Sequence, residues 1–105
     1  MSNVVLKLPS SDLASRSSAV RERYKLVSAV QQGQQVVVDL SEVLSISESY
    51  ADELFGVLAA HYGLEWITRN VALIDVTDTV LEVIATVIDR RLVEANNEQP
   101  VLKIA

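Results

Sequence analysis

Hydroxyl and carboxylate side chains gather between positions 39 and 53, the part of the chain whose residue types could carry chemistry. Four serines and five acidic residues fall there: Asp39, Ser41, Glu42, Ser45, Ser47, Glu48, Ser49, Asp52 and Glu53. Carboxylates can exchange protons or bind a cation, and a serine can cap a helix or accept a phosphate. Each of these chemistries makes a different demand on spacing.

Catalysis fits this spacing poorly. Asp52 and Glu53 are adjacent in a predicted helix, so their side chains point about 100° apart and make a poor acid/base pair. His61 is the single histidine, cysteine is absent, and neither a Gly-x-Ser-x-Gly turn nor a glycine-rich phosphate loop occurs. Glu48 and Asp52, one helical turn apart, give only weak support to a cation site. We therefore expect a protein that is not an enzyme and has no cofactor and no bound metal.

The same segment predicts the start of a helix. Ser47 or Ser49 can accept a backbone N–H, and the acids at 52 and 53 complement the positive end of the helix dipole. The segment also fits an exposed recognition loop on a rigid scaffold, and a capping residue can also contact a partner. We predict that a protein partner binds through Ser47, Glu48, Ser49, Tyr50 and Asp52.

Hydrophobic periodicity predicts the elements that position these residues. Strands are expected at residues 4–8, 36–40, 71–74 and 101–104. Helices are expected from residues 10–12 to about 32, from 47–49 to about 62, and from a capping box at Thr79 to a turn at 96–100. The order β-α-β-α-β-α-β predicts an α/β fold with a mostly parallel or mixed four-stranded sheet and about three helices. The two inner strands are continuously apolar, which is typical of a sheet covered on both faces, whereas the outer two carry a lysine and are expected at the edges.

Length and composition narrow the function further. A chain of 105 residues is expected to form one domain, spanning residues 1–105. Its formal net charge is −5 and no basic stripe occurs, so nucleic acid is not an expected partner. No apolar run approaches the ~18 residues of a membrane helix, and the opening residues are unlike a signal peptide, so we expect a cytoplasmic protein without membrane insertion.

The segment 36–54 resembles the strand, turn and helix start of STAS domains, the fold of bacterial anti-sigma-factor antagonists. The stretch from Val36 to Val43 is similar to the strand that precedes the regulatory serine of those domains. The stretch from Ile46 to Leu54 is closer to a divergent STAS-like branch in which Ser-x-Ser, an aromatic residue and Ala-Asp-Glu open the helix. Residues 13–16 and 20–21 also resemble that branch. The likeness covers nearly the whole chain, and its most specific part is the stretch from Asp39 to Leu54.

The resemblance implies a regulatory protein-binding module that takes part in partner switching. In STAS antagonists, a histidine-kinase-like ATPase phosphorylates the first serine of an Asp-Ser-Ser-Gly stretch at the start of the second helix. Here Ser47, Glu48, Ser49 and Tyr50 occupy those four positions, so an acid replaces the phosphorylated serine. Ser47 and Ser49 remain candidate phosphorylation sites, although a phosphate there would lie near several acids. Our hypothesis is that Glu48 supplies a permanent charge and that phosphorylation at the usual position does not switch this protein.

Two alternatives remain open. The chain could be a structural STAS subunit that docks on a transport ATPase or forms a stable homodimer, and an exposed strip of Tyr50, Phe55 and Tyr62 would favour that reading. It could also be a small-ligand enzyme, which a deep pocket with convergent polar groups would favour.

Overall fold

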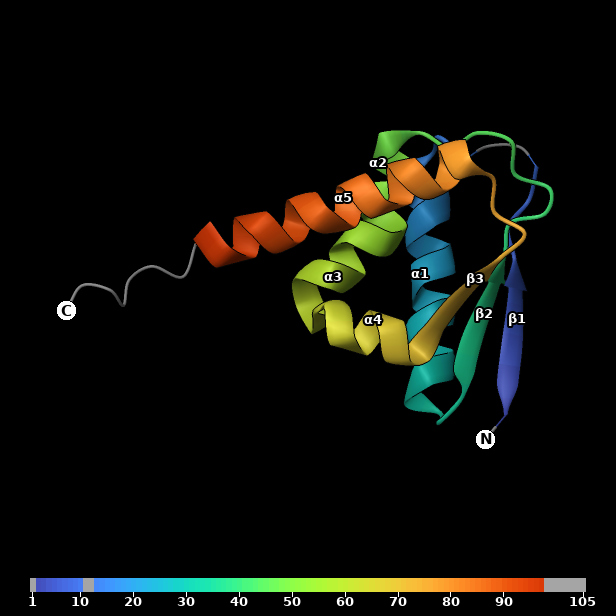
Figure 1. Cartoon of the computed structure of the whole chain (residues 1–105). Helices are drawn as coiled ribbons and strands as arrows, with labels where there is room; N and C mark the ends of the chain where they lie inside the picture. The colour runs from blue at the N-terminus through green and yellow to red at the C-terminus, as the bar shows by residue number, and fades with distance from the viewer. Residues whose placement is uncertain (1, 11–12, 98–105) are drawn as a thin grey trace.

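The fold is known from a computed structural model that describes residues 2–10 and 13–97. Its elements follow the chain in this order: β1 (Asn3–Lys7), α1 (Arg16–Gln31), β2 (Gln35–Asp39), α2 (Glu48–Ala51), η1 (Asp52–Gly56), α3 (Val57–Tyr62), α4 (Leu64–Asn70), β3 (Val71–Ile74) and α5 (Asp78–Asn97). The η1 segment is a π-helical turn between α2 and α3, so these three segments form one continuous helix. The α/β class and the parallel sheet are therefore confirmed (Figure 1).

The sheet has the strand order β1-β2-β3 and both pairings are parallel. Val36 pairs in register with Val4 and Val71, and Val38 pairs with Leu6 and Leu73. The expectation of four strands is not met, because the described residues contain three; the predicted strand at 101–104 lies outside them. β1 lies at an edge, as predicted from its lysine, but β3 lies at the other edge of the described sheet.

Helices cover one face of the sheet (Figure 1). On that face Val36 and Val38 are buried, and their β1 and β3 neighbours are half-buried. On the other face Val5 is 60% exposed and Ile74 is 40% exposed. The prediction that inner strands are covered on both sides is therefore wrong for the described part of the chain, because apolar runs record the residue types of both faces without recording what covers them.

Within residues 2–10 and 13–97 four helices are observed where about three were expected, counting α2–η1–α3 as one. The extra helix is α4, which begins directly after Gly63 in a segment expected to be a short connection. Gly63 ends α3 as a C-terminal glycine with φ of 89°, a conformation that favours residues without a Cβ. The chain therefore stops one helix and starts another at the same residue.

Two helix starts differ from the prediction. The N-cap of α1 is Ser15, whose hydroxyl accepts from the Ser18 N–H, rather than a residue in the range 10–12. The Thr77 hydroxyl accepts from the Val80 N–H and caps α5, two residues before the predicted capping box. α5 also continues through Asn97, so the turn predicted at 96–100 is wrong at its first two residues; the others lie outside the described residues.

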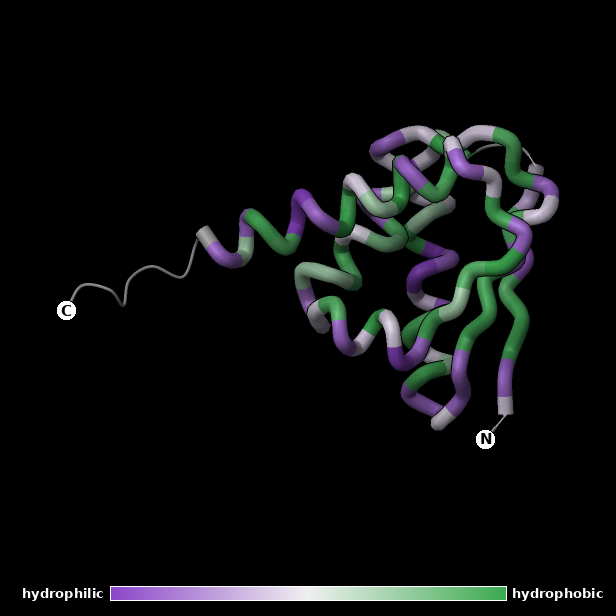
Figure 2. Tube along the Cα trace, viewed as in Figure 1, coloured by the Kyte–Doolittle hydropathy of each residue, from purple (hydrophilic) through white to green (hydrophobic). Residues whose placement is uncertain are grey.

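The core lies between the sheet and the α2–η1–α3 helix. Its largest fully buried side chains include Tyr50, Phe55, Leu54 and Leu58 from that helix. Figure 2 shows hydrophobic residues along the strands, and hydrophobic residues alternating with hydrophilic ones along α5. Burial of these side chains therefore fixes the position of the whole α2–η1–α3 helix, including the start of α2.

Candidate functional site

The loop between β2 and α2 is anchored at two points and exposed between them. Val43 is 1% exposed and Ile46 is 9% exposed, whereas Leu44 between them is 81% exposed. The Asp39 carboxylate accepts the Ser41 N–H at 2.9 Å at the start of the loop, and this hydrogen bond lowers the pKa of Asp39. The loop follows the carboxyl end of β2, the edge of a parallel sheet at which α/β proteins bind ligands and partners.

Ser47 is the N-cap of α2, as one of the two predicted candidates. Its hydroxyl accepts the Tyr50 N–H at 3.0 Å, and its own N–H donates to the Leu13 carbonyl at 3.1 Å. Ser49 is half-buried and lies in the first turn of α2. The two serines therefore differ in role, since the hydroxyl of Ser47 already accepts a structural hydrogen bond.

Tyr50 is a core residue, which corrects its selection as a contact residue. Its side chain is 1% exposed, and burial raises its pKa to about 12. Phe55 is also 1% exposed, while Tyr62 is 43% exposed and stacks on Trp66 with ring centroids 4.4 Å apart. The exposed Tyr50–Phe55–Tyr62 strip that would have favoured a structural subunit therefore does not form.

Arginines from α1 and α5 surround the acids at the start of the second helix. We call this group the acid–arginine cluster; it contains Glu48, Asp52, Glu53, Arg16, Arg23, Arg90 and Arg91. Three carboxylates thus face four guanidinium groups. The surface around the start of the second helix therefore carries both signs of charge, whereas the sequence of residues 39–53 shows only the acidic residues.

The strongest pair in the cluster joins η1 to α5. Arg91 donates to both carboxylate oxygens of Asp52, from Nε at 2.9 Å and from Nη2 at 2.7 Å. This two-pronged contact lowers the pKa of Asp52 and raises the pKa of Arg91. A Cβ on Gly56 would lie 2.2 Å from Asp52 Oδ1 and 3.3 Å from Arg91 Cγ, so glycine at this position leaves the space that the pair occupies.

Glu53 joins η1 to α1. Its carboxylate accepts from Arg23 and from Arg16, each at 3.0 Å, and Arg23 also donates to the Glu53 carbonyl. Arg23 is the main cause of the lowered pKa of Glu53. The side chain of Arg23 is only 14% exposed, so this contact serves mainly to hold α1 against η1.

Glu48 is the most exposed acid of the cluster. Its side chain is 65% exposed, and its pair with Arg90 is long at 3.3 Å. Arg16, Glu48, Ser49, Asp52 and Arg90 line one open depression beside the first turn of α2. The structure therefore brings together Glu48, Ser49 and Asp52 of the predicted set, adds Arg16 and Arg90, and removes Tyr50.

Sequence reasoning missed the arginines because their partners are distant along the chain. Arg90 and Arg91 lie in the C-terminal half of a predicted helix, where the negative end of the helix dipole alone would account for basic residues. A signal for α1 was present, since Arg16 and Arg23 are seven residues apart and share one helix face. Nothing in the sequence shows that this face meets η1.

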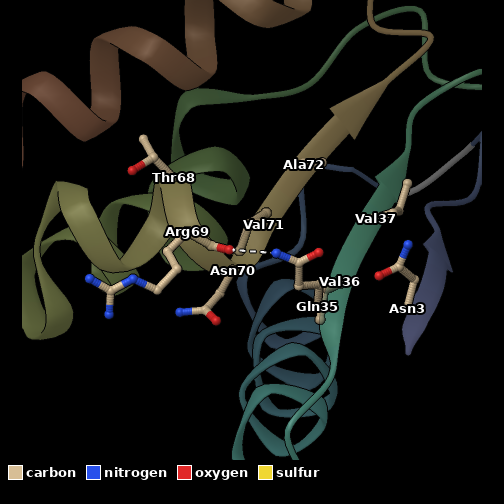
Figure 3. Close-up of a pocket in the computed structure, with 9 residues that line it drawn as sticks. All are labelled: Asn3, Gln35, Val36, Val37, Thr68, Arg69, Asn70, Val71 and Ala72. Atoms are coloured by element: carbon tan, nitrogen blue, oxygen red, sulfur yellow. Dashed lines mark hydrogen bonds between the residues drawn. The ribbon is translucent and has the colours of Figure 1, made fainter. Parts of the chain in front are cut away.

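A second depression lies at the opposite end of the sheet. It is lined by Asn3, Gln35, Val36, Val37, Thr68, Arg69, Asn70, Val71 and Ala72 (Figure 3). The Gln35 amide donates to the Arg69 carbonyl at 2.9 Å, and the Asn70 amide donates to the Trp66 carbonyl at 2.9 Å. Its lining contains no histidine or carboxylate.

The described residues contain neither a cluster of metal ligands nor a helix that could span a membrane. Within residues 2–10 and 13–97, no three histidine, cysteine, aspartate or glutamate residues are grouped so as to hold a metal ion. Over the same residues, every helix is too short or too polar to cross a bilayer.

The sequence of residues 19–81 matches a family described as a STAS-like domain of unknown function (DUF4325). The match covers more than half of the chain, from α1 to the first turn of α5, and includes the β2–α2 loop and the first turn of α2. The chain therefore belongs to this STAS-like family, as its resemblance to STAS domains implied. No curated protein and no solved structure matches the chain.

Proposed function

We propose that this protein is a non-catalytic regulatory module that binds a protein partner through the β2–α2 loop and the first turn of α2. The observation that carries the proposal is the combination of an exposed apolar residue, Leu44, with the exposed charges of Glu48, Arg90 and Arg16. An aliphatic contact beside charges of both signs suits a charge-guided protein interface. Membership of a STAS-like family supports the same surface, because STAS antagonists bind partners there.

The partner class that we propose is a histidine-kinase-like ATPase, and the setting is partner switching in a bacterial cytoplasm. The support is the likeness of residues 36–54 to the regulatory segment of anti-sigma-factor antagonists. In this scheme Glu48 contributes a charge that is always present, and its weak pair with Arg90 can be exchanged for a pair with the partner at little cost.

Pairing with arginine weakens the electrostatic repulsion that a phosphate on Ser47 or Ser49 would meet. Glu48, Asp52 and Glu53 are each paired with arginine, so they repel a nearby phosphate less than free carboxylates would. Our hypothesis that phosphorylation at the usual position does not switch this protein therefore rests on Glu48, which occupies that position. A structural subunit on a transport ATPase receives no specific support, because the aromatic strip that would favour it is buried at two of its three residues.

Affinity capture from a cell extract tests the proposal. The wild-type chain should enrich an ATPase of the histidine-kinase-like class, and Glu48→Ala should lower that enrichment several-fold. Glu65→Ala is the matched control, because Glu65 is an exposed acid paired with Arg69 at 3.0 Å on α4, away from the site. Equal enrichment by all three chains, or no ATPase in any of them, would contradict the proposal.

A further inference from the structure

The helices α1 and α5 each contribute one inner and one outer arginine to the acid–arginine cluster. On α1, the side chain of Arg23 is 14% exposed, whereas that of Arg16 is 61% exposed. On α5, the side chain of Arg91 is 32% exposed, whereas that of Arg90 is 48% exposed. Arg16 and Arg90, which we call the outer arginines, line the same open depression as Ser49.

Arg90 makes a weaker contact than its neighbour Arg91. Arg91 donates to both carboxylate oxygens of Asp52, at 2.9 and 2.7 Å. Both terminal nitrogens of Arg90 instead reach the same oxygen of Glu48, each at 3.3 Å. Exposed ion pairs of this kind contribute little to stability, so Arg90 can exchange Glu48 for a group of a partner at small cost.

Positive charge is in excess by one within the acid–arginine cluster. Three of its arginines each pair with a different carboxylate. The fourth, Arg16, shares the carboxylate of Glu53 with Arg23, so it has no carboxylate of its own in the cluster. After the hydrogen bond from Arg91, the charges of the two outer arginines also lower the pKa of Asp52. The outer arginines therefore act on the same depression, and they carry the excess charge at its exposed rim.

We propose that the outer arginines, Arg16 and Arg90, together bind one carboxylate side chain of the protein partner. A guanidinium group matches the geometry of a carboxylate and can donate two parallel hydrogen bonds to it. A carboxylate carries the single negative charge that the cluster can balance, whereas a phosphate carries about −1.5 to −2 and is repelled more strongly by Glu48. The inference rests on the proposed function, because it names the chemistry of the partner at the same surface.

Carbodiimide cross-linking to the captured ATPase tests for this carboxylate directly, because the reagent joins a carboxylate to a lysine amine and not to arginine. Arg16→Lys and Arg90→Lys keep the charge, and each should give several-fold more cross-linked complex than the wild type. Arg69→Lys is the matched control, because Arg69 is an exposed arginine paired with Glu65 on α4, and it should give no gain. No gain from either outer position, or an equal gain from Arg69→Lys, would overturn the proposal.

Affinity measurements separate a direct contact from an effect through Glu48. If Arg90 binds the partner, Arg90→Ala should weaken binding to the ATPase several-fold, as should Arg16→Ala. If Arg90 serves only to hold Glu48, its removal would free that acid and leave binding unchanged or stronger, which would overturn the proposal. A wild-type chain that binds no ATPase would contradict the proposed function and this inference together. Binding that depends on Glu48 and not on the outer arginines would contradict the inference alone.

Discussion

Gly56 is the residue that allows Asp52 and Arg91 to meet. A side chain at this position would occupy the space of the Asp52 carboxylate, one turn earlier in the π-helical segment. π-helical turns inside α-helices often lie at functional sites, and this one places Asp52 and Glu53 between two arginine-bearing helices. The same glycine therefore affects both the stability of the helix and the geometry of the acid–arginine cluster.

A double-mutant cycle measures this role. We expect Gly56→Ala to lower the free energy of unfolding by about 1–3 kcal/mol, because the new methyl group displaces Asp52 from Arg91. In an Asp52→Ala background, Gly56→Ala should instead be neutral or stabilise by up to about 1 kcal/mol, the usual helix preference for alanine. Urea unfolding of the four chains gives the coupling free energy, and simple additivity would show that Gly56 does not serve the pair.

Acid should weaken the same cluster. Arg91 lowers the pKa of Asp52 below its ordinary 3.8, and Arg23 lowers the pKa of Glu53 below its ordinary 4.5. Because the folded-state values are depressed, the stability from these pairs is complete above the ordinary values and is lost as the pH falls through the folded-state values.

The pH dependence can be checked with Asp52→Asn, which cannot titrate at this position. The difference between the urea midpoints of wild type and variant should be constant from neutral pH down to about pH 5 and should shrink below about pH 4. A difference that persists unchanged at about pH 3 would mean that the Asp52 charge does not contribute to stability.

At the scale of elements, the sequence predicted what depends on neighbouring residues. The start of the second helix was predictable because Ser47 is a local capping signal and Leu54 and Leu58 continue one apolar stripe. β3 was predicted at its observed bounds from a short apolar run. The α1 start was expected at residues 10–12 rather than at Ser15 because the residue types at both places are good helix caps, and the sequence does not distinguish them.

The site was predictable in position but only partly in composition. Ser47, Glu48, Ser49 and Asp52 lie at the first turns of the second helix, as their spacing implies. Tyr50 was expected on the contact surface because its neighbours in the sequence are polar, but it lies on the buried face of the helix. The arginine partners were not predictable, since Asp52 and Arg91 are 39 positions apart and meet only through the packing of α5 on η1.

A prediction at this scale concerns modification of the first turn of α2. After incubation with the captured ATPase and ATP, the wild-type chain should keep its unmodified intact mass, because Glu48 replaces the usual serine. Glu48→Ser restores a hydroxyl at that position and should gain one phosphate. Stoichiometric phosphate on Ser47 or Ser49 of the wild type, or none on the Glu48→Ser variant, would contradict this part of the scheme.

At the scale of the whole molecule, the two ends of the sheet differ in the charged groups that lie beside them. The carboxyl ends of the strands lead to the β2–α2 loop and the acid–arginine cluster, which we propose as the partner surface. The opposite end carries the depression lined by residues from Asn3 to Ala72, whose lining contains no carboxylate.

The central claim is that a partner binds at the β2–α2 loop and the first turn of α2, and hydrogen exchange measures this most directly. The chain is compared with and without the ATPase that it captures, peptide by peptide. We predict slower amide exchange in residues 40–52 and unchanged exchange in α4, whose Leu64–Asn70 span serves as an internal control. Protection confined to other segments, with residues 40–52 unchanged, would contradict the claim.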